Sequence, residues 1–260
     1  MTSQYAKLFD MHGKVVFAAG GAGAIGAEMA RALEEYGASV AVADVSQAVC
    51  DQVSTELSAS GGMALGVAMN VLDEASVAAA VAAVEANLGP IDVLINTVGV
   101  HVEQPAHELT LAAWDKVLDV NLRGAFVLSQ AVARAMITNG KSGSHIHVTS
   151  VRSNLGIRRG YAAYCASKGG LSTLIKQLAT EWARYGIRVN GIAPTFTRTP
   201  LVESYLNDPE FYTALVNRIP LGRVCETSDL VGLAIFLASD ASAFITGQNI
   251  FVDGGVTATQ

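Results

Sequence analysis

The sequence predicts one doubly wound α/β domain with a largely parallel, seven-stranded sheet that helices cover on both faces. Short apolar runs typical of strands alternate along the chain with segments whose apolar residues recur every three or four positions. Hydrophobic residues make up 51% of the chain and charged residues only 15%, as expected for strands buried on both faces. The 260 residues contain no linker, so residues 1–260 are expected to form a single domain with a core of about 14–255.

Composition and charge exclude several classes of protein. The net charge of −6 argues against a nucleic acid partner. The first residues contain no apolar signal-peptide core, and no apolar run approaches the roughly 18 residues of a membrane span, so we expect a cytoplasmic protein with no membrane partner. The three cysteines, Cys50, Cys165 and Cys225, are widely spaced, which indicates reduced thiols and neither disulfides nor a metal site.

The first strand-like run, Lys14–Ala19, leads into the glycine-rich sequence Gly20–Gly26. Apolar residues then recur at helical spacing, so the glycines join a strand to a helix N-terminus. Such a junction offers free backbone N–H groups and the positive end of the helix to a phosphate, although any tight strand-to-helix turn can carry glycines. The predicted contacts to the pyrophosphate of a dinucleotide are Gly20, Gly23, Ala24, Ile25 and Gly26.

The second strand, Ser39–Asp44, ends in a carboxylate that can accept hydrogen bonds from both hydroxyls of an adenosine ribose. Asp44 would repel a 2′-phosphate, and no Lys or Arg lies within Gly20–Gly26 or directly after Asp44. These observations favour NAD(H) over NADP(H). The alternative is an ordinary Asp in a turn or at a helix N-cap.

Two more strands are predicted before the middle of the chain, at Met63–Met69 and Ile91–Ile95, with a helix over Asp73–Leu88 between them. Asn96 at the end of the second strand needs hydrogen-bonding partners, and we expect it to bridge the central strands. Gly99 would let a cofactor approach the backbone. His101 is expected to be an exposed loop histidine at the lip of the cleft, and a substrate contact is the alternative.

A long helical pattern runs from Leu111 to Ile137, and Asn121 interrupts its inward face. A buried amide in a helix needs partners. Spacing alone leaves two roles open, a water-binding site in a proton relay or a helix kink whose amide bonds the backbone.

The strand-like sequence HIHVTS ends at Ser150, and the helical pattern after it places Tyr164 and Lys168 one turn apart on one face. Phenol, amine and hydroxyl together can polarise a carbonyl and move a proton. A free phenol with a pKa of about 10 needs a nearby cation to act as a base at neutral pH. The alternative for Tyr164 and Lys168 is an ordinary amphipathic helix. Tyr161 lies about two turns from Lys168, too far to be the base.

These motifs resemble the short-chain dehydrogenase/reductase family, whose fold is of the Rossmann type and which the likeness covers from about Lys14 to Gly255. The resemblance implies that Tyr164 is the acid/base and that Ser150 holds the substrate oxygen. It implies that Lys168 holds the cofactor ribose and lowers the pKa of the phenol, and that Asn121 binds a relay water. Catalytic residues are therefore Asn121, Ser150, Tyr164 and Lys168, and substrate contacts are Ser150, Arg152 and Tyr164.

The same resemblance adds cofactor contacts and marks departures from the family pattern. The added contacts to the dinucleotide are Asn70, Val71, Asn96, Gly99, Tyr164, Lys168, Pro194, Thr197 and Thr199. Departures are Ala19 and Ala24 in the glycine turn, Asn70 where Asp is usual, Thr97 and Val98 after Asn96, and Thr195 and Thr197 after Pro194.

The remaining segments frame a substrate cleft. Residues 151–161 carry Arg152, Arg158 and Arg159, which could hold a carboxylate, a phosphate or a polyhydroxylated substrate, or could be solvated or bridge subunits. A substrate lid is predicted at about 195–218. A strand over Gly186–Ala193, a helix over Asp229–Leu237 and a last strand over Asn249–Val252 complete the domain.

The resulting prediction is an NAD-dependent oxidoreductase that interconverts a secondary alcohol and a ketone by hydride transfer. The family resemblance and the arginines favour a sugar, polyol or sugar acid as substrate, and the resemblance implies a homotetramer. Two alternatives stay open. One is a 3-ketoacyl-(acyl carrier protein) reductase, which would prefer NADPH and a basic docking surface. The other is a non-catalytic dinucleotide-binding sensor, which would not need the set of Ser, Tyr, Lys and Asn.

Overall fold

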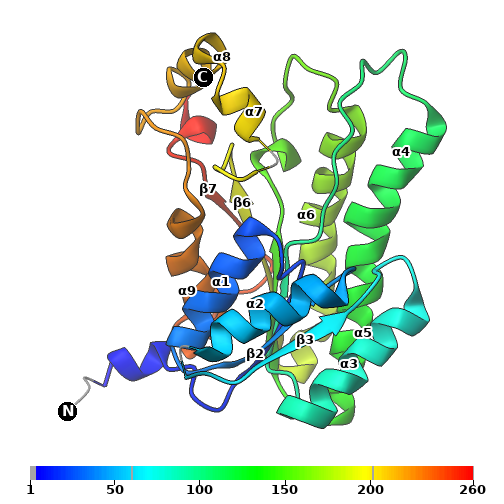
Figure 1. Ribbon diagram of the computed structural model, residues 1–260, viewed down its shortest axis with the longest axis vertical. Helices are drawn as coiled ribbons and strands as arrows, with labels where there is room; N and C mark the ends of the chain where they lie inside the picture. Colours follow the sequence, from blue (N-terminus) through cyan, green and yellow to red (C-terminus); the bar gives the residue numbers. More distant parts are fainter. Residues whose placement is uncertain (1–3, 60, 201, 260) are drawn as a thin grey trace.

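Seven parallel strands form the central sheet of the computed structural model, which describes residues 4–59, 61–200 and 202–259 (Figure 1). Their order is β3-β2-β1-β4-β5-β6-β7, and every neighbouring pair is parallel. The strands are β1 (Val15–Ala19), β2 (Ser39–Asp44), β3 (Ala64–Ala68), β4 (Val93–Asn96), β5 (Gly143–Val148), β6 (Ile187–Pro194) and β7 (Asn249–Val252). The order reverses between β1 and β4, and ligands of such sheets bind beyond the carboxyl ends of the strands at this point.

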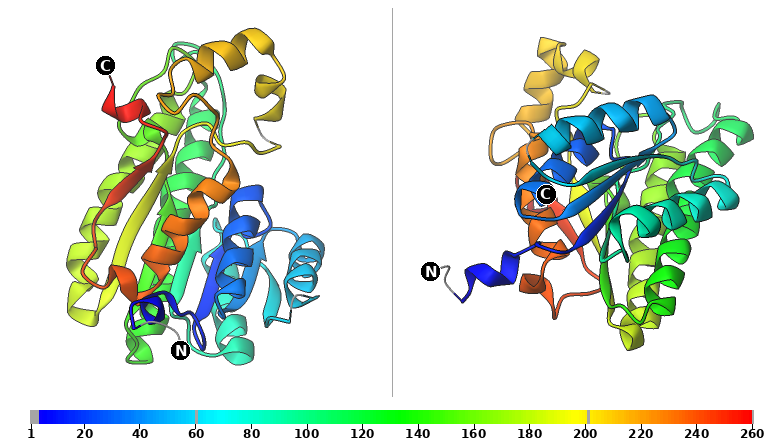
Figure 2. Two further views of the ribbon diagram at one scale, coloured as in Figure 1. Left: turned by 90° about the vertical axis from the view of Figure 1, so that its left-hand side faces the viewer. Right: turned by 60° about the horizontal axis from the view of Figure 1, so that its bottom comes forward.

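Helices form a layer on each face of the sheet (Figures 1 and 2). One layer contains α1 (Ala24–Glu35), α2 (Gln47–Ala59) and α9 (Val231–Ala238). The other contains α3 (Glu74–Leu88), α4 (Leu111–Leu118), α5 (Gly124–Thr138) and α6 (Ala162–Trp182). Short 3-10 turns are Ala6–Phe9, Val151–Ser153, Ala183–Tyr185, Thr227–Leu230, Asp240–Ser242 and Val256–Ala258.

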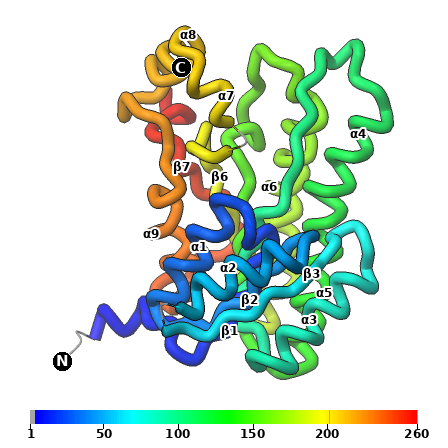
Figure 3. The backbone as a smooth tube through the Cα atoms, in the orientation of Figure 1, coloured from blue at the N-terminus to red at the C-terminus, as the bar shows by residue number. Residues whose placement is uncertain are grey.

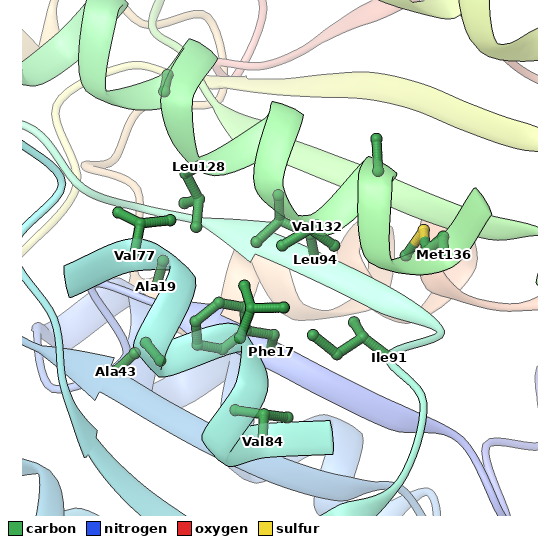
Figure 4. Close-up of a cluster of buried hydrophobic side chains, with 14 of the residues drawn as sticks. Phe17, Ala19, Ala43, Val77, Val84, Ile91, Leu94, Leu128, Val132 and Met136 are labelled. Atoms are coloured by element: carbon green, nitrogen blue, oxygen red, sulfur yellow. The ribbon is translucent and has the colours of Figure 1, made fainter. Parts of the chain in front are cut away.

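The core consists of two apolar layers because alternate residues of each strand face opposite sides of the sheet. Phe17 packs with Leu94 and Val132 in the layer beneath α3 and α5 (Figure 4). Its neighbour Val16 faces the other layer, where Leu33 of α1 is also fully buried. Burial on both faces holds the strand ends, and the loops that follow them, in fixed positions.

The predicted doubly wound domain and its seven strands are confirmed, with a fully parallel sheet. The single helix expected over 111–137 is wrong in one respect, because a π-helical turn, Asp119–Arg123, separates α4 from α5. No helix within the described ranges is both long enough and apolar enough to span a membrane.

Two short helices, α7 (Glu203–Leu206) and α8 (Pro209–Val216), occupy the segment predicted as a lid, apart from residue 201, which lies outside the described residues. Figure 3 shows them beyond the carboxyl ends of β6 and β7. Asp208 caps α8 by accepting hydrogen bonds from the backbone N–H groups of Glu210 and Phe211. The helices α7 and α8 therefore lie on the side of the sheet where the carboxyl ends of the strands meet.

Candidate active site

The glycine-rich turn between β1 and α1 is packed too closely for larger residues. Gly20 has a φ of 72°, and a Cβ there would lie 2.5 Å from the Thr97 hydroxyl oxygen. A Cβ at Gly26 would overlap the Gly20 carbonyl oxygen. Gly23 and Ala24 are exposed at the start of α1, where no side chain caps the helix. The free N–H groups of this helix end fit the phosphates of a dinucleotide.

Thr97 ties β4 to this turn. Its hydroxyl lies 3.1 Å from the Ala19 carbonyl oxygen and 2.9 Å from that of Gly20, to which it donates. The departure from the family pattern at Thr97 therefore has a structural role, which is to fix the glycine turn against the end of β4.

The residues predicted to hold the adenosine lie at the ends of β2 and β3. The backbone N–H of Gly20 donates to the Ala43 carbonyl at 2.8 Å, so the end of β2, with Asp44, lies beside the glycine turn. Asn70 is exposed, and its amide oxygen accepts from the Leu72 N–H at 3.0 Å. Val71 is buried in the core. Asp44 and Asn70 thus present polar groups near the turn, whereas Val71 offers little surface to a ligand.

Asn96 bridges the central strands, as predicted. Its side-chain N–H lies 3.2 Å from Nδ1 of His147 on β5, and Nε2 of His147 lies 3.2 Å from the Ser129 hydroxyl. Ser129 donates its own proton to the Ala125 carbonyl at 2.6 Å, so it accepts one from His147. His147 is therefore the neutral Nε2–H tautomer. Burial, and the nearby charge of Lys168, lower the pKa of His147 to about 4.

Ser150 and Tyr164 meet at the carboxyl end of β5. Ser150 lies two residues after the end of β5, and its hydroxyl accepts from the Arg152 N–H at 3.1 Å. Burial raises the pKa of Tyr164 to about 12, and a hydrogen bond with the Ser150 side chain opposes that rise. A hydroxyl and a phenol that share a hydrogen bond can bind one substrate oxygen between them.

Lys168 is buried one turn further along α6. Its ammonium group donates to the Val148 carbonyl at 2.8 Å and lies 5.8 Å from the centre of the Tyr164 ring. Burial outweighs the other influences on the Tyr164 phenol, so the expected lowering of its pKa by Lys168 stays a prediction. Burial lowers the pKa of Lys168 itself to about 8.

Asn121 lies in the π-helical turn and is fully buried. Its amide oxygen accepts from the Val100 N–H at 2.7 Å, and its amide nitrogen donates to the Val100 carbonyl at 2.9 Å and to the Ser167 hydroxyl at 3.0 Å. The Asn121 side chain therefore hydrogen bonds mainly to the backbone. This is the second of the two roles that the spacing of the sequence left open. A Cβ at Gly99 would lie 3.5 Å from both the Asn121 amide oxygen and the Lys168 nitrogen, so Gly99 leaves the space beside both open.

His101 is not the exposed loop residue that the sequence indicated. Its ring lies 3.9 Å from that of Tyr161 and 5.2 Å from that of Tyr164, measured between centroids. Both ring nitrogens are buried and have no hydrogen-bond partner among the residues that the structure describes. The only sequence signal for this role was the place of His101 just after β4.

An arginine cavity of about 150 Å³ lies between the loop after β5, the start of the 195–218 segment and α8. The arginines that line it are Arg152, Arg158, Arg159 and Arg218. Arg152 is buried and donates to the Gly156 carbonyl at 2.8 Å. Of the four arginines that line the cavity, only Arg159 has an ion pair within the described part of the chain, at 2.7 Å to Glu103. Arg152, Arg158 and Arg218 have no ion pair among the described residues, and most of the other residues that line the cavity are apolar.

The segment after β6 is held by internal contacts. Pro194 is the last residue of β6, and Thr197 is buried with its hydroxyl donating to the Thr195 carbonyl at 3.1 Å. Thr199 is half-buried. The Thr197 hydroxyl is therefore engaged within its own loop, and the predicted contacts of Pro194, Thr197 and Thr199 to a nicotinamide stay predictions.

Contacts across the cleft join this segment to two other loops. Glu103, after β4, pairs with Arg159 and accepts a hydrogen bond from the Tyr205 hydroxyl at 3.1 Å. The Arg159 guanidinium lies 4.8 Å from the centre of the Tyr205 ring and 5.3 Å from that of Phe211. The two helices of the segment thus contact the loop after β4 and the loop after β5.

Comparison with known proteins identifies the family. A family model described as enoyl-(acyl carrier protein) reductase matches residues 20–257. Gluconate 5-dehydrogenase from Gluconobacter oxydans is 38% identical over 250 residues, which cover 96% of this chain and 97% of that protein. D-threitol dehydrogenase from Mycolicibacterium smegmatis is 39% identical over 249 residues, covering 96% and 95% of the two chains.

Among solved structures, that of a gluconate 5-dehydrogenase from Burkholderia cenocepacia, in complex with NADP and tartrate, has a TM-score of 0.94 and 37% identity to this chain. The match covers 98% of this chain and 99% of that one. The chain therefore belongs to the short-chain dehydrogenase/reductase family. It is an oxidoreductase with a Rossmann-type fold.

Proposed function

We propose that the protein interconverts a secondary alcohol and a ketone on a polyhydroxylated acid, using NAD(H). The observation that carries the proposal is the pairing of the Ser150 and Tyr164 hydroxyls, together with a cavity lined by three unpaired arginines. The pair supplies acid/base chemistry at one oxygen, and the arginines supply recognition of a carboxylate.

Each residue at the centre has a defined task. Tyr164 removes the proton of the substrate hydroxyl during oxidation and returns it during reduction. Ser150 donates a hydrogen bond to the same oxygen and stabilises the charge that develops there. Lys168 would hold the cofactor ribose. Asn121, whose side chain is bonded to Val100 and Ser167, fixes the backbone that follows Gly99. The bound nicotinamide, when present, accepts or supplies the hydride at the substrate carbon.

The substrate class follows from charge. The chain carries a net charge of −6, so an arginine-lined cavity is a local exception that attracts anions. Arg152 is the best placed of these arginines, because it is buried and its charge acts on the pKa of Tyr164. Relatives named for gluconate and threitol support a sugar acid or a polyol.

NAD(H) is proposed as the cofactor because Asp44 ends β2 beside the glycine turn, where its carboxylate would repel a 2′-phosphate. The solved structure of the Burkholderia cenocepacia enzyme is in complex with NADP. The substrate panel below therefore compares NAD⁺ with NADP⁺ directly. The homotetramer remains an expectation from family resemblance, and the cytoplasmic location remains one from the sequence pattern.

A substrate panel tests the proposal. The purified protein is incubated with NAD⁺ or NADP⁺ and gluconate, threitol or a simple secondary alcohol, and with NADH or NADPH and a 3-ketoacyl thioester. We expect the highest kcat/KM with a polyhydroxylated substrate and NAD⁺. Faster turnover of the thioester with NADPH would favour the acyl reductase, and no turnover of any compound would favour the non-catalytic sensor.

A further inference from the structure

His101 is a polar side chain that the fold encloses without satisfying it. It lies two residues after Gly99, on the segment that leaves β4 for the cleft. Neither ring nitrogen has a hydrogen-bond partner in the described ranges, although both atoms are buried. A buried donor or acceptor without a partner costs roughly 1–3 kcal/mol, so its presence calls for an explanation.

His101 and His145 are the two histidines whose ring nitrogens lack hydrogen-bond partners among the described residues, and they differ in position. His145 is completely buried in the middle of β5, packed between His147 and Trp182, where no ligand can reach it. His101 instead packs against the ring of Tyr164, at a centroid distance of 5.2 Å. Of these two histidines, only His101 therefore has its ring in contact with a residue of the candidate reaction centre.

The surroundings of His101 fix its ring and keep it neutral. Tyr161 packs on it at 3.9 Å between centroids, which sets the position of the ring. Burial lowers the pKa of His101, and the two charged groups that act on it, Glu103 and Arg159, have opposite effects and pair with each other. A neutral imidazole presents one donor and one acceptor, which matches the hydroxyl group of a sugar or polyol.

We propose that His101 determines specificity by hydrogen bonding to the substrate hydroxyl on the carbon next to the reacting carbon. The inference rests on the proposed function, in which Ser150 and Tyr164 hold the reacting oxygen. Because His101 packs against the ring that carries the Tyr164 hydroxyl, the hydroxyl on the neighbouring carbon of a vicinal diol is the substrate group best placed to reach its imidazole. The substrate hydroxyl is thereby the hydrogen-bond partner that the imidazole lacks among the described residues.

The test compares butane-2,3-diol with butan-2-ol, which share a carbon skeleton and differ in the neighbouring hydroxyl. kcat and KM are measured for the wild type, His101→Phe and His101→Gln. Phe keeps a ring against Tyr161 and removes both nitrogens, whereas Gln restores a donor and an acceptor. His107→Gln is the matched control, because His107 is exposed on the same connecting segment.

The wild type should prefer the diol, and His101→Phe should lose about tenfold of that preference, mainly through a higher KM for the diol. His101→Gln should recover most of it, and His107→Gln should match the wild type. An unchanged preference in His101→Phe, or no preference in the wild type, overturns the role of His101 alone. A wild type that oxidises no alcohol of the wider panel overturns the proposed function as well.

Discussion

Lys168 donates a 2.8 Å hydrogen bond to the backbone carbonyl of Val148, the last residue of β5. This bond anchors α6 to the strand that leads to Ser150, so it helps to fix the spacing between the Ser150 and Tyr164 hydroxyls. It also leaves a cation almost completely buried with a single neutral partner. The site is thus assembled at a cost in stability.

Replacing Lys168 by Met should stabilise the fold while removing activity. The folded state lowers the pKa of Lys168 from 10.5 to about 8, which corresponds to a cost of about 3 kcal/mol for the charged form. This cost is constant below pH 8 and declines as pH rises from 8 toward 10.5, because the unfolded chain then keeps the proton that the folded chain has lost. Loss of the bond to Val148 offsets part of the gain, so we expect a net increase of about 1–2 kcal/mol at pH 7.

Chemical denaturation at pH 7 measures this change. Lys176→Met is the control, because Lys176 lies on the same helix and is exposed. It should change the free energy of unfolding by less than about 0.5 kcal/mol. A Lys168→Met protein less stable than the wild type would show that the burial cost has been overstated.

Stability should fall in mild acid because of His145. Burial lowers its pKa from 6.5 to about 3, so the unfolded chain binds a proton that the folded chain does not. The free energy of unfolding that His145 contributes is fully present above pH 6.5 and is lost as the pH falls toward 3. From pH 7 to pH 5 the loss attributable to His145 is about 2 kcal/mol.

The matching experiment records urea denaturation at pH 7 and pH 5 for the wild type and His145→Leu. Leu removes the titrating group without stranding a partner, since no described residue bonds the ring nitrogens of His145. Between pH 7 and pH 5, His145→Leu should lose about 2 kcal/mol less free energy of unfolding than the wild type. His107→Leu, which changes an exposed histidine, should behave as the wild type. Equal pH dependence in all three would contradict the assignment.

Asp44 should control the choice of dinucleotide. Titration of the protein with NADH and with NADPH, followed by the fluorescence of the nicotinamide, gives the two Kd values. We expect the wild type to bind NADH at least about tenfold more tightly, and Asp44→Asn to lose most of that difference because the carboxylate charge is gone. Asp115→Asn, an exposed change on α4, should leave both Kd values unaltered. Tighter binding of NADPH by the wild type would refute the role of Asp44.

Arg218→Gln should weaken binding of acidic substrates only. Arg218 lines the arginine cavity and is exposed, so its loss should raise the KM for gluconate about three- to tenfold after allowance for screening by solvent. The KM for neutral threitol should not change. Arg134→Gln removes an exposed arginine from α5 and serves as the control. A parallel rise in both KM values would point to a change in the fold of the cavity and away from charge recognition.

The elements of the fold were accessible from the sequence because their signals are local. The strand before Gly20 and the helix after Gly26 follow from apolar periodicity, and the place of Tyr164 and Lys168 on one helix follows from a spacing of four residues. The bridge from Asn96 also followed, since a buried amide at a strand end has few partners to choose from.

Features that depend on packing between distant segments were not accessible. The partner of Lys168 is a backbone carbonyl 20 residues earlier, and no side-chain pattern marks it. The burial of His101 comes from Tyr161, 60 positions away. The π-helical turn at Asn121 arises in a segment whose apolar spacing is that of a continuous helix.

The central claim is that Tyr164 exchanges a proton with the substrate hydroxyl that it holds together with Ser150. Turnover of the best substrate of the panel, measured for Tyr164→Phe beside Tyr185→Phe at a distant tyrosine, tests it most directly. The account predicts that kcat falls by about 10²- to 10⁴-fold in Tyr164→Phe, with NADH still bound, and stays unchanged in Tyr185→Phe. A Tyr164→Phe protein that turns over at the wild-type rate would contradict the account.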